Sequence, residues 1–144
     1  MKLAFLLWLA SVLPAPVADQ VCLATTVYLE ARSEPEAGQL AVAEVAMTRR
    51  DSGRWGDSVC SVLRAPNQFA LSTTHPGFVV RNPVALAKAW RIANRVTQMW
   101  ALPHDERDLV VPYANSFYAS SIDPPAWAKN RVATIGSHYF YRVN

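Results

Sequence analysis

The chain has 144 residues and a formal net charge of +3, with 51% hydrophobic and 17% charged residues. This length suits one ordinary domain, and this composition excludes wholesale disorder. No run of Lys or Arg is present, so we expect no nucleic-acid partner, whereas a mildly basic charge suits an anionic polymer.

The first 18 residues have the pattern of a secretory leader. Lys2 gives a positive start, residues 3–13 are an almost unbroken apolar run, and small and proline residues follow. The run is shorter than the about 20 residues of a membrane-spanning helix. We therefore expect residues 1–18 to be a leader and 19–144 to be one domain exported to the periplasm or cell wall. A cut after Ala18 leaves Pro16 where a small residue is preferred, so an uncleaved membrane anchor stays an alternative.

Two cysteines, Cys22 and Cys60, remain in the expected domain. A cysteine pair in an exported protein indicates a disulfide, which is worth about 4 kcal/mol for a loop of this length. The alternative is a Cys nucleophile with a histidine partner. His75, His104 and His138 form no recognisable Cys–His arrangement with either cysteine.

Apolar spacing and turn residues predict four helices in chain order. Their ranges are 20–33, 35–50, 57–64 and 83–102. The predicted helix over 83–102 has an apolar stripe formed by Leu86, Trp90, Ala93 and Val96. This stripe places Trp90 in the core. Between the last two, residues 65–82 are predicted to be a long loop, and loops of that length are often functional.

The C-terminal part changes character. Residues 115–120 and 132–141 are rich in aromatic and β-branched side chains and could pair as a hairpin across the proline-containing loop at 123–127. The predicted fold class is therefore α+β, mostly helical, with a small antiparallel β-hairpin or sheet.

Glu30 differs from the other carboxylates of the chain. It follows Leu23 and Val27 on the apolar side of its predicted helix, near the helix end. Burial and the negative end of the helix dipole would both raise the pKa of this carboxyl group, as a general acid requires. The pattern alone, however, favours a solvated or salt-bridged glutamate, paired for example with Arg32, because a Glu near a helix end is more often of that kind.

Three stretches together resemble the SleB-like cell wall hydrolases. The first is Tyr28-Leu-Glu-Ala-Arg-Ser-Glu-Pro with the Gly-Gln and Ala-Val-Ala that follow it. The second is Val59-Cys-Ser-Val with Asn67-Gln-Phe, and the third is Val132-Ala-Thr-Ile-Gly-Ser-His-Tyr-Phe-Tyr after Trp127. They occur in the order of the family and cover most of the chain after residue 18. Ser33 replaces the Gly of the first motif and Ser137 the Asn of the third, so details of the site can differ from the family.

The resemblance implies a lysozyme-like domain that cleaves the glycan strand of peptidoglycan as a monomer, without metal or cofactor. The first motif Glu falls on Glu30, to which the resemblance assigns the acid/base role of a lytic transglycosylase. The second falls on Glu34, which we expect to be structural, to orient the site or to contact substrate, with a part in catalysis as the alternative. Gln68, Phe69 and Tyr118 are expected to bind substrate, and His138 to be structural.

Other activities on the same polymer remain open at this stage. A hydrolytic muramidase would use a second carboxylate, and Asp57 and Glu44 are candidates. A zinc amidase would need clustered His and carboxylate ligands, which three scattered histidines do not supply. A wall-binding domain without activity is the third possibility, and the retained Glu30 argues against it.

Overall fold

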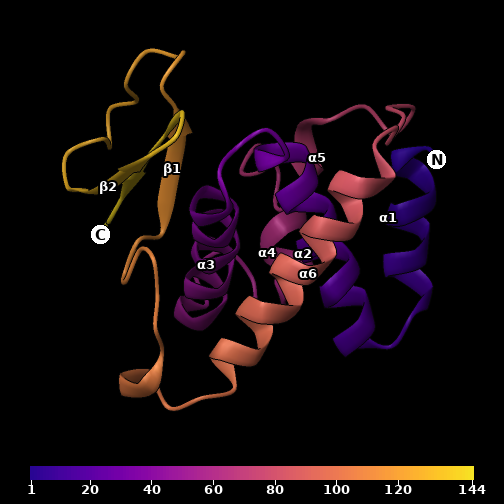
Figure 1. Cartoon of the computed structure of the whole chain (residues 1–144), viewed down its shortest axis with the longest axis horizontal. Helices are drawn as coiled ribbons and strands as arrows, with labels where there is room; N and C mark the ends of the chain where they lie inside the picture. Colours follow the sequence, from indigo (N-terminus) through magenta and orange to yellow (C-terminus); the bar gives the residue numbers. More distant parts are fainter.

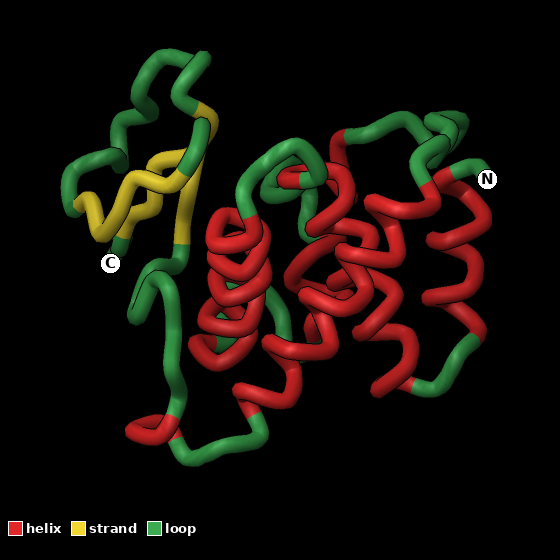
Figure 2. Tube along the Cα trace, in the orientation of Figure 1, coloured by secondary structure: helices red, strands yellow, loops and turns green.

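Six α-helices form a helical body, and a small sheet lies beside it (Figure 1). The computed structural model describes residues 1–144. The helices are α1 (Leu3–Val12), α2 (Ala15–Ala31), α3 (Glu36–Ser52), α4 (Val59–Arg64), α5 (Ala70–Thr73) and α6 (Pro83–Trp100). A 3-10 helix, η1 (His104–Glu106), follows α6 and leads toward the sheet (Figure 2).

Helix α2 begins earlier than the sequence predicted. Pro14 is its N-cap and Pro16 lies in its first turn, where a proline needs no hydrogen-bond partner for its nitrogen. The prolines that suggested the end of a leader therefore start a helix. The expected boundary after Ala18 falls inside α2, and cleavage there stays a prediction.

Helix α1 packs against α2 at the edge of the body farthest from the sheet (Figure 1). Leu3 and Leu6 are buried in this contact, whereas Phe5 and Trp8 are exposed and stack on each other with ring centroids 6.0 Å apart. The chain contains no helix with the length and apolar character that crossing a membrane requires.

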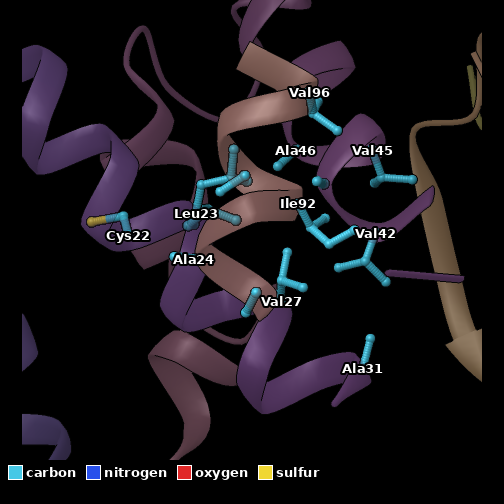
Figure 3. Close-up of a cluster of buried hydrophobic side chains, with 14 of the residues drawn as sticks. Cys22, Leu23, Ala24, Val27, Ala31, Val42, Val45, Ala46, Ile92 and Val96 are labelled. Carbon is cyan, nitrogen blue, oxygen red and sulfur yellow. The ribbon is translucent and has the colours of Figure 1, made fainter. Parts of the chain in front are cut away.

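The core lies where α2, α3 and α6 meet (Figure 3). Val27 of α2, Val42 of α3 and Ile92 of α6 each lie in this cluster and are at most 3% exposed. Close packing of aliphatic side chains supplies most of the stability of such a body. The expected place of Trp90 in this core is wrong: it is 36% exposed, because Ala89, one position earlier, faces the core instead.

The sheet has three strands in the order β1-β3-β2, all antiparallel. They are β1 (Ser116–Ala119), β2 (Arg131–Ile135) and β3 (His138–Tyr141). The segment predicted as one strand thus folds back on itself at Gly136, whose φ of 54° suits glycine. The hairpin is β2–β3, and β1 joins it by pairing with β3. The mostly helical α+β class with a small antiparallel sheet is confirmed.

Candidate active site

Glu30 lies in the last turn of α2, next to α5. Burial raises the pKa of its carboxyl group from 4.5 to about 7, and the backbone N–H of Ala70 opposes part of that rise by favouring the carboxylate. A substantial fraction of Glu30 is therefore protonated at neutral pH. This is the property that a general acid needs.

The loop predicted over residues 65–82 contains the short helix α5, which brings Ala70 to Glu30. Just before it, Asn67 has a φ of 61°, the left-handed region that Asn tolerates better than most residues. Gln68 is exposed, whereas Phe69 is 2% exposed and packs against Phe117 of β1, with ring centroids 5.9 Å apart. Of the two predicted glycan contacts in this loop, only Gln68 is open to solvent.

Glu34 connects the α2–α3 corner to the β2–β3 turn. Its Oε1 accepts a hydrogen bond from the Ser137 backbone N–H at 2.8 Å and lies 3.3 Å from Nδ1 of His138. A side chain at Gly136 would come within 2.6 Å of the same oxygen, so the close approach requires glycine there. Burial lowers the pKa of His138, and Glu34 partly counteracts this. These contacts give Glu34 and His138 structural positions, and a substrate contact for Glu34 stays a prediction.

Tyr118 lies on the opposite face of β1 from Phe117. It is 6% exposed, stacks on Tyr141 with ring centroids 5.6 Å apart, and is covered edge-on by Trp127. Its hydroxyl is 3.4 Å from the hydroxyl of Tyr141. The structure therefore does not bring Tyr118 together with Phe69, and its expected contact with substrate stays a prediction.

Arg49, on α3, was missed in the sequence analysis. It is 7% exposed, and its guanidinium lies over the rings of Trp55 and Phe69, 4.4 and 4.9 Å from their centroids. Its Nη1 donates to Oε1 of Gln68 at 3.1 Å. A signal existed in the sequence, because Arg49 lies four residues after Val45 and seven after Val42 and so shares the buried face of α3.

The candidate second carboxylates have different surroundings. Glu44 is 3% exposed, and its two oxygens accept the backbone N–H groups of Val110 and Val111 at 3.0 and 2.8 Å. Burial raises the pKa of Glu44, and these hydrogen bonds oppose the rise. Asp57 is exposed just before α4. Through these hydrogen bonds, Glu44 holds the segment that leads into β1 in place.

Cys22 of α2 and Cys60 of α4 form the predicted disulfide. In Figure 3 the Cys22 side chain lies on the side of α2 away from the sheet. The five main surface cavities are lined by other residues than Glu30. The pKa of the Glu30 carboxyl group therefore depends on its burial and on the nearby backbone N–H of Ala70, and not on one of these cavities.

Comparisons with known proteins identify relatives. The family model described as Cell Wall Hydrolase matches residues 33–141 and so begins three positions after Glu30. The spore cortex-lytic enzyme of Oceanobacillus iheyensis is 29% identical over 134 residues, which are 85% of this chain and 41% of that protein. The spore cortex-lytic enzyme of Bacillus subtilis is 30% identical over 118 residues, 82% of this chain and 35% of that protein.

Two solved structures share the fold. The catalytic domain of the germination-specific lytic transglycosylase SleB from Bacillus anthracis superposes with a TM-score of 0.68 at 23% identity, covering 86% of this chain and 93% of that domain. The catalytic domain of Bacillus cereus SleB gives a TM-score of 0.63 at 23% identity, covering 86% of this chain and 89% of that domain. The chain spans less than half the length of the curated relatives, and it corresponds to nearly the whole of these two catalytic domains.

Proposed function

Since the chain belongs to the cell wall hydrolase family, we propose that it cleaves peptidoglycan glycan strands between N-acetylmuramic acid and N-acetylglucosamine, as a lytic transglycosylase with Glu30 as its acid/base. The observation that carries this proposal is the place of Glu30 in the last turn of α2, packed against α5, where burial raises the pKa of its carboxyl group to about 7. The SleB catalytic domains of the same fold, one of them described as a lytic transglycosylase, support the assignment.

The reaction follows from the two protonation states of one carboxyl group. Protonated Glu30 donates its proton to the glycosidic oxygen as the bond to C1 of N-acetylmuramic acid breaks. An oxocarbenium-like centre then develops at C1. The Glu30 carboxylate next takes the proton of the muramic 6-hydroxyl, whose oxygen bonds to C1 and closes a 1,6-anhydro ring. Because the pKa lies near neutral pH, Glu30 can act in both directions.

The hydrolytic alternative would require a second carboxylate to activate water. Glu44 already accepts two backbone hydrogen bonds, and Oε1 of Glu34 accepts one from Ser137. Glu44 therefore holds the segment before β1, Glu34 holds the β2–β3 turn, and Asp57 is exposed just before α4, which favours the version with one glutamate. We infer that Gln68 contacts the glycan. We also infer that the protein works as an exported monomer whose leader, if retained, is its only membrane contact.

Digestion of purified peptidoglycan, followed by mass spectrometry of the products, tests the proposal. The protein should release fragments that end in 1,6-anhydro-muramic acid, and Glu30→Gln should lower the rate by about 10²- to 10⁴-fold. Glu36→Gln, at an exposed position on α3, serves as the control. Reducing muramic ends would establish a muramidase and freed stem peptides an amidase, whereas full activity of Glu30→Gln would refute the role of Glu30.

A further inference from the structure

Arg49 is a buried cation for which the acid/base chemistry provides no role. Its guanidinium is 7% exposed, and none of the ion pairs of the structure includes it. Burial and the charge of Arg54 lower its pKa to about 10, which leaves it charged at neutral pH. A buried charge without a counter-ion is costly unless its donors are well used.

The donors of Arg49 connect the two walls of the candidate site. On the sheet side, Nε donates to the backbone oxygen of Asn115 at 2.6 Å and Nη2 to Oγ of Ser116 at 3.4 Å. On the loop side, Nη1 donates to Oε1 of Gln68, and the guanidinium lies over the ring of Phe69. One side chain thus joins the start of β1 to the two residues that precede α5.

These two loop residues position the amide next to Glu30. Phe69 is the N-cap of α5, and Ala70 is its first residue. Helix α5 packs against α2, the helix that carries Glu30, and the backbone N–H of Ala70 favours the ionised form of Glu30. Any movement of residues 68–69 therefore moves the one backbone donor that favours ionised Glu30.

Arg49 also determines the orientation of the Gln68 amide. A guanidinium only donates hydrogen bonds, so the oxygen of Gln68 must face it. The NH2 group then points away from Arg49, on a side chain that is exposed. The loop consequently presents a hydrogen-bond donor, which suits an acceptor such as the acetamido oxygen of an N-acetylated sugar.

We propose that Arg49 is a positioning residue that holds Gln68 and the Ala70 amide in place beside Glu30 and ties them to β1. This inference rests on the proposed function for its consequence in catalysis, but the arrangement itself can be tested without substrate. Lysine is the informative replacement, because it keeps the positive charge but carries its donors on one compact nitrogen, which cannot span the acceptors on both sides as the planar guanidinium does.

The experiment combines a ¹³C NMR titration of the Glu30 carboxyl group with steady-state kinetics on peptidoglycan. In Arg49→Lys the pKa of Glu30 should rise above about 7, because the Ala70 N–H no longer stabilises the carboxylate as well. The high-pH limb of the activity profile should move to higher pH together with the pKa of Glu30, and kcat should fall about 10²-fold. The control is Arg50→Lys, whose guanidinium pairs with Asp51 on the surface at 3.2 Å.

A folded Arg49→Lys protein with the parent pKa and kcat would overturn the inference. If that variant does not fold, Gln68→Met decides, because it removes the same hydrogen bond from an exposed position. A raised pKa of Glu30 in Gln68→Met would support the positioning role of Arg49, and an unchanged pKa would overturn it. Failure of the proposed function would look different: Glu30→Gln would remain active while the pKa response to Arg49→Lys persisted.

Discussion

The helical body and the sheet are held in place by different kinds of contact. In the body, α2, α3 and α6 meet through aliphatic side chains such as Val27, Val42 and Ala93, each fully buried. The sheet is joined to the body in part by charged side chains, since Glu34 and Arg49 hydrogen-bond to its backbone. Apolar packing is spread over many atoms, whereas a hydrogen bond depends on one donor and one acceptor. Substitution of a single polar side chain can therefore loosen the sheet and its side of the site while the body stays intact.

The disulfide should produce the largest effect, and it should act on both regions together. Replacing Cys22 and Cys60 by alanine is expected to lower the free energy of unfolding by about 4 kcal/mol, because the bridge restricts the unfolded chain. Urea unfolding followed by far-UV and by aromatic circular dichroism should show both signals shifting to the same lower midpoint. Separate midpoints for the two signals would mean that the sheet does not depend on the body.

The carboxyl group of Glu30 should lower stability at high pH. Its folded pKa of about 7 lies above the ordinary 4.5, so its stabilising contribution is complete below pH 4.5 and is lost as the pH rises through about 7. Glu30→Gln should therefore be more stable than the parent at pH 8, by up to about 3 kcal/mol, and gain nothing at pH 4. Unfolding free energies of both proteins at the two pH values check this. An equal difference at both would contradict burial as the cause of the raised pKa.

Glu44 should matter most for the segment that leads into the sheet. Glu44→Ala leaves the backbone N–H groups of Val110 and Val111 without their acceptor and should cost about 2 kcal/mol. Hydrogen exchange should accelerate at these two amides more than in the core of α2. Glu106→Ala, in the exposed turn after α6, is the matched control. Uniform acceleration throughout the chain would argue against a local tether.

The smallest effect is expected at the β2–β3 turn. Glu34→Ala removes the acceptor of the Ser137 N–H and should cost about 1 kcal/mol, with faster exchange of that amide. Glu36→Ala should change stability by less than about 0.5 kcal/mol, because the partner of Glu36, Arg95, is as exposed as Glu36 itself. Thermal unfolding of both variants tests the pair. If the two losses are equal, the Glu34 contact does not stabilise the turn.

The places where sequence and structure disagree have a common physical cause. Apolar residues spaced three or four apart correctly predicted α6 but placed Trp90 in the core. The buried face of the helix is instead rotated by one residue, so that Ala89 is buried and Trp90 is exposed. Likewise the C-terminal segment was predicted as one strand, because a turn with a single glycine, Gly136, interrupts the aromatic pattern only briefly. The periodicity of apolar residues predicts the type of element more reliably than it predicts the rotation of that element or the elements with which it pairs.

Local pattern and residue chemistry determined much of this protein on their own. They were sufficient for the helices that carry strong apolar spacing, the α+β class and the Cys22–Cys60 pairing. Each of these depends on neighbours in the chain or on a choice among very few residues.

Only the tertiary structure decided the long-range contacts of the candidate site. The amide of Ala70, the tether of Glu34 to Ser137 and the bridge that Arg49 makes from Gln68 to β1 join residues that are far apart in the chain. A hydrogen bond requires its atoms to approach within about 3 Å. No sequence spacing encodes that distance, because it results from the packing of α2, α3 and α5 against one another and against the sheet.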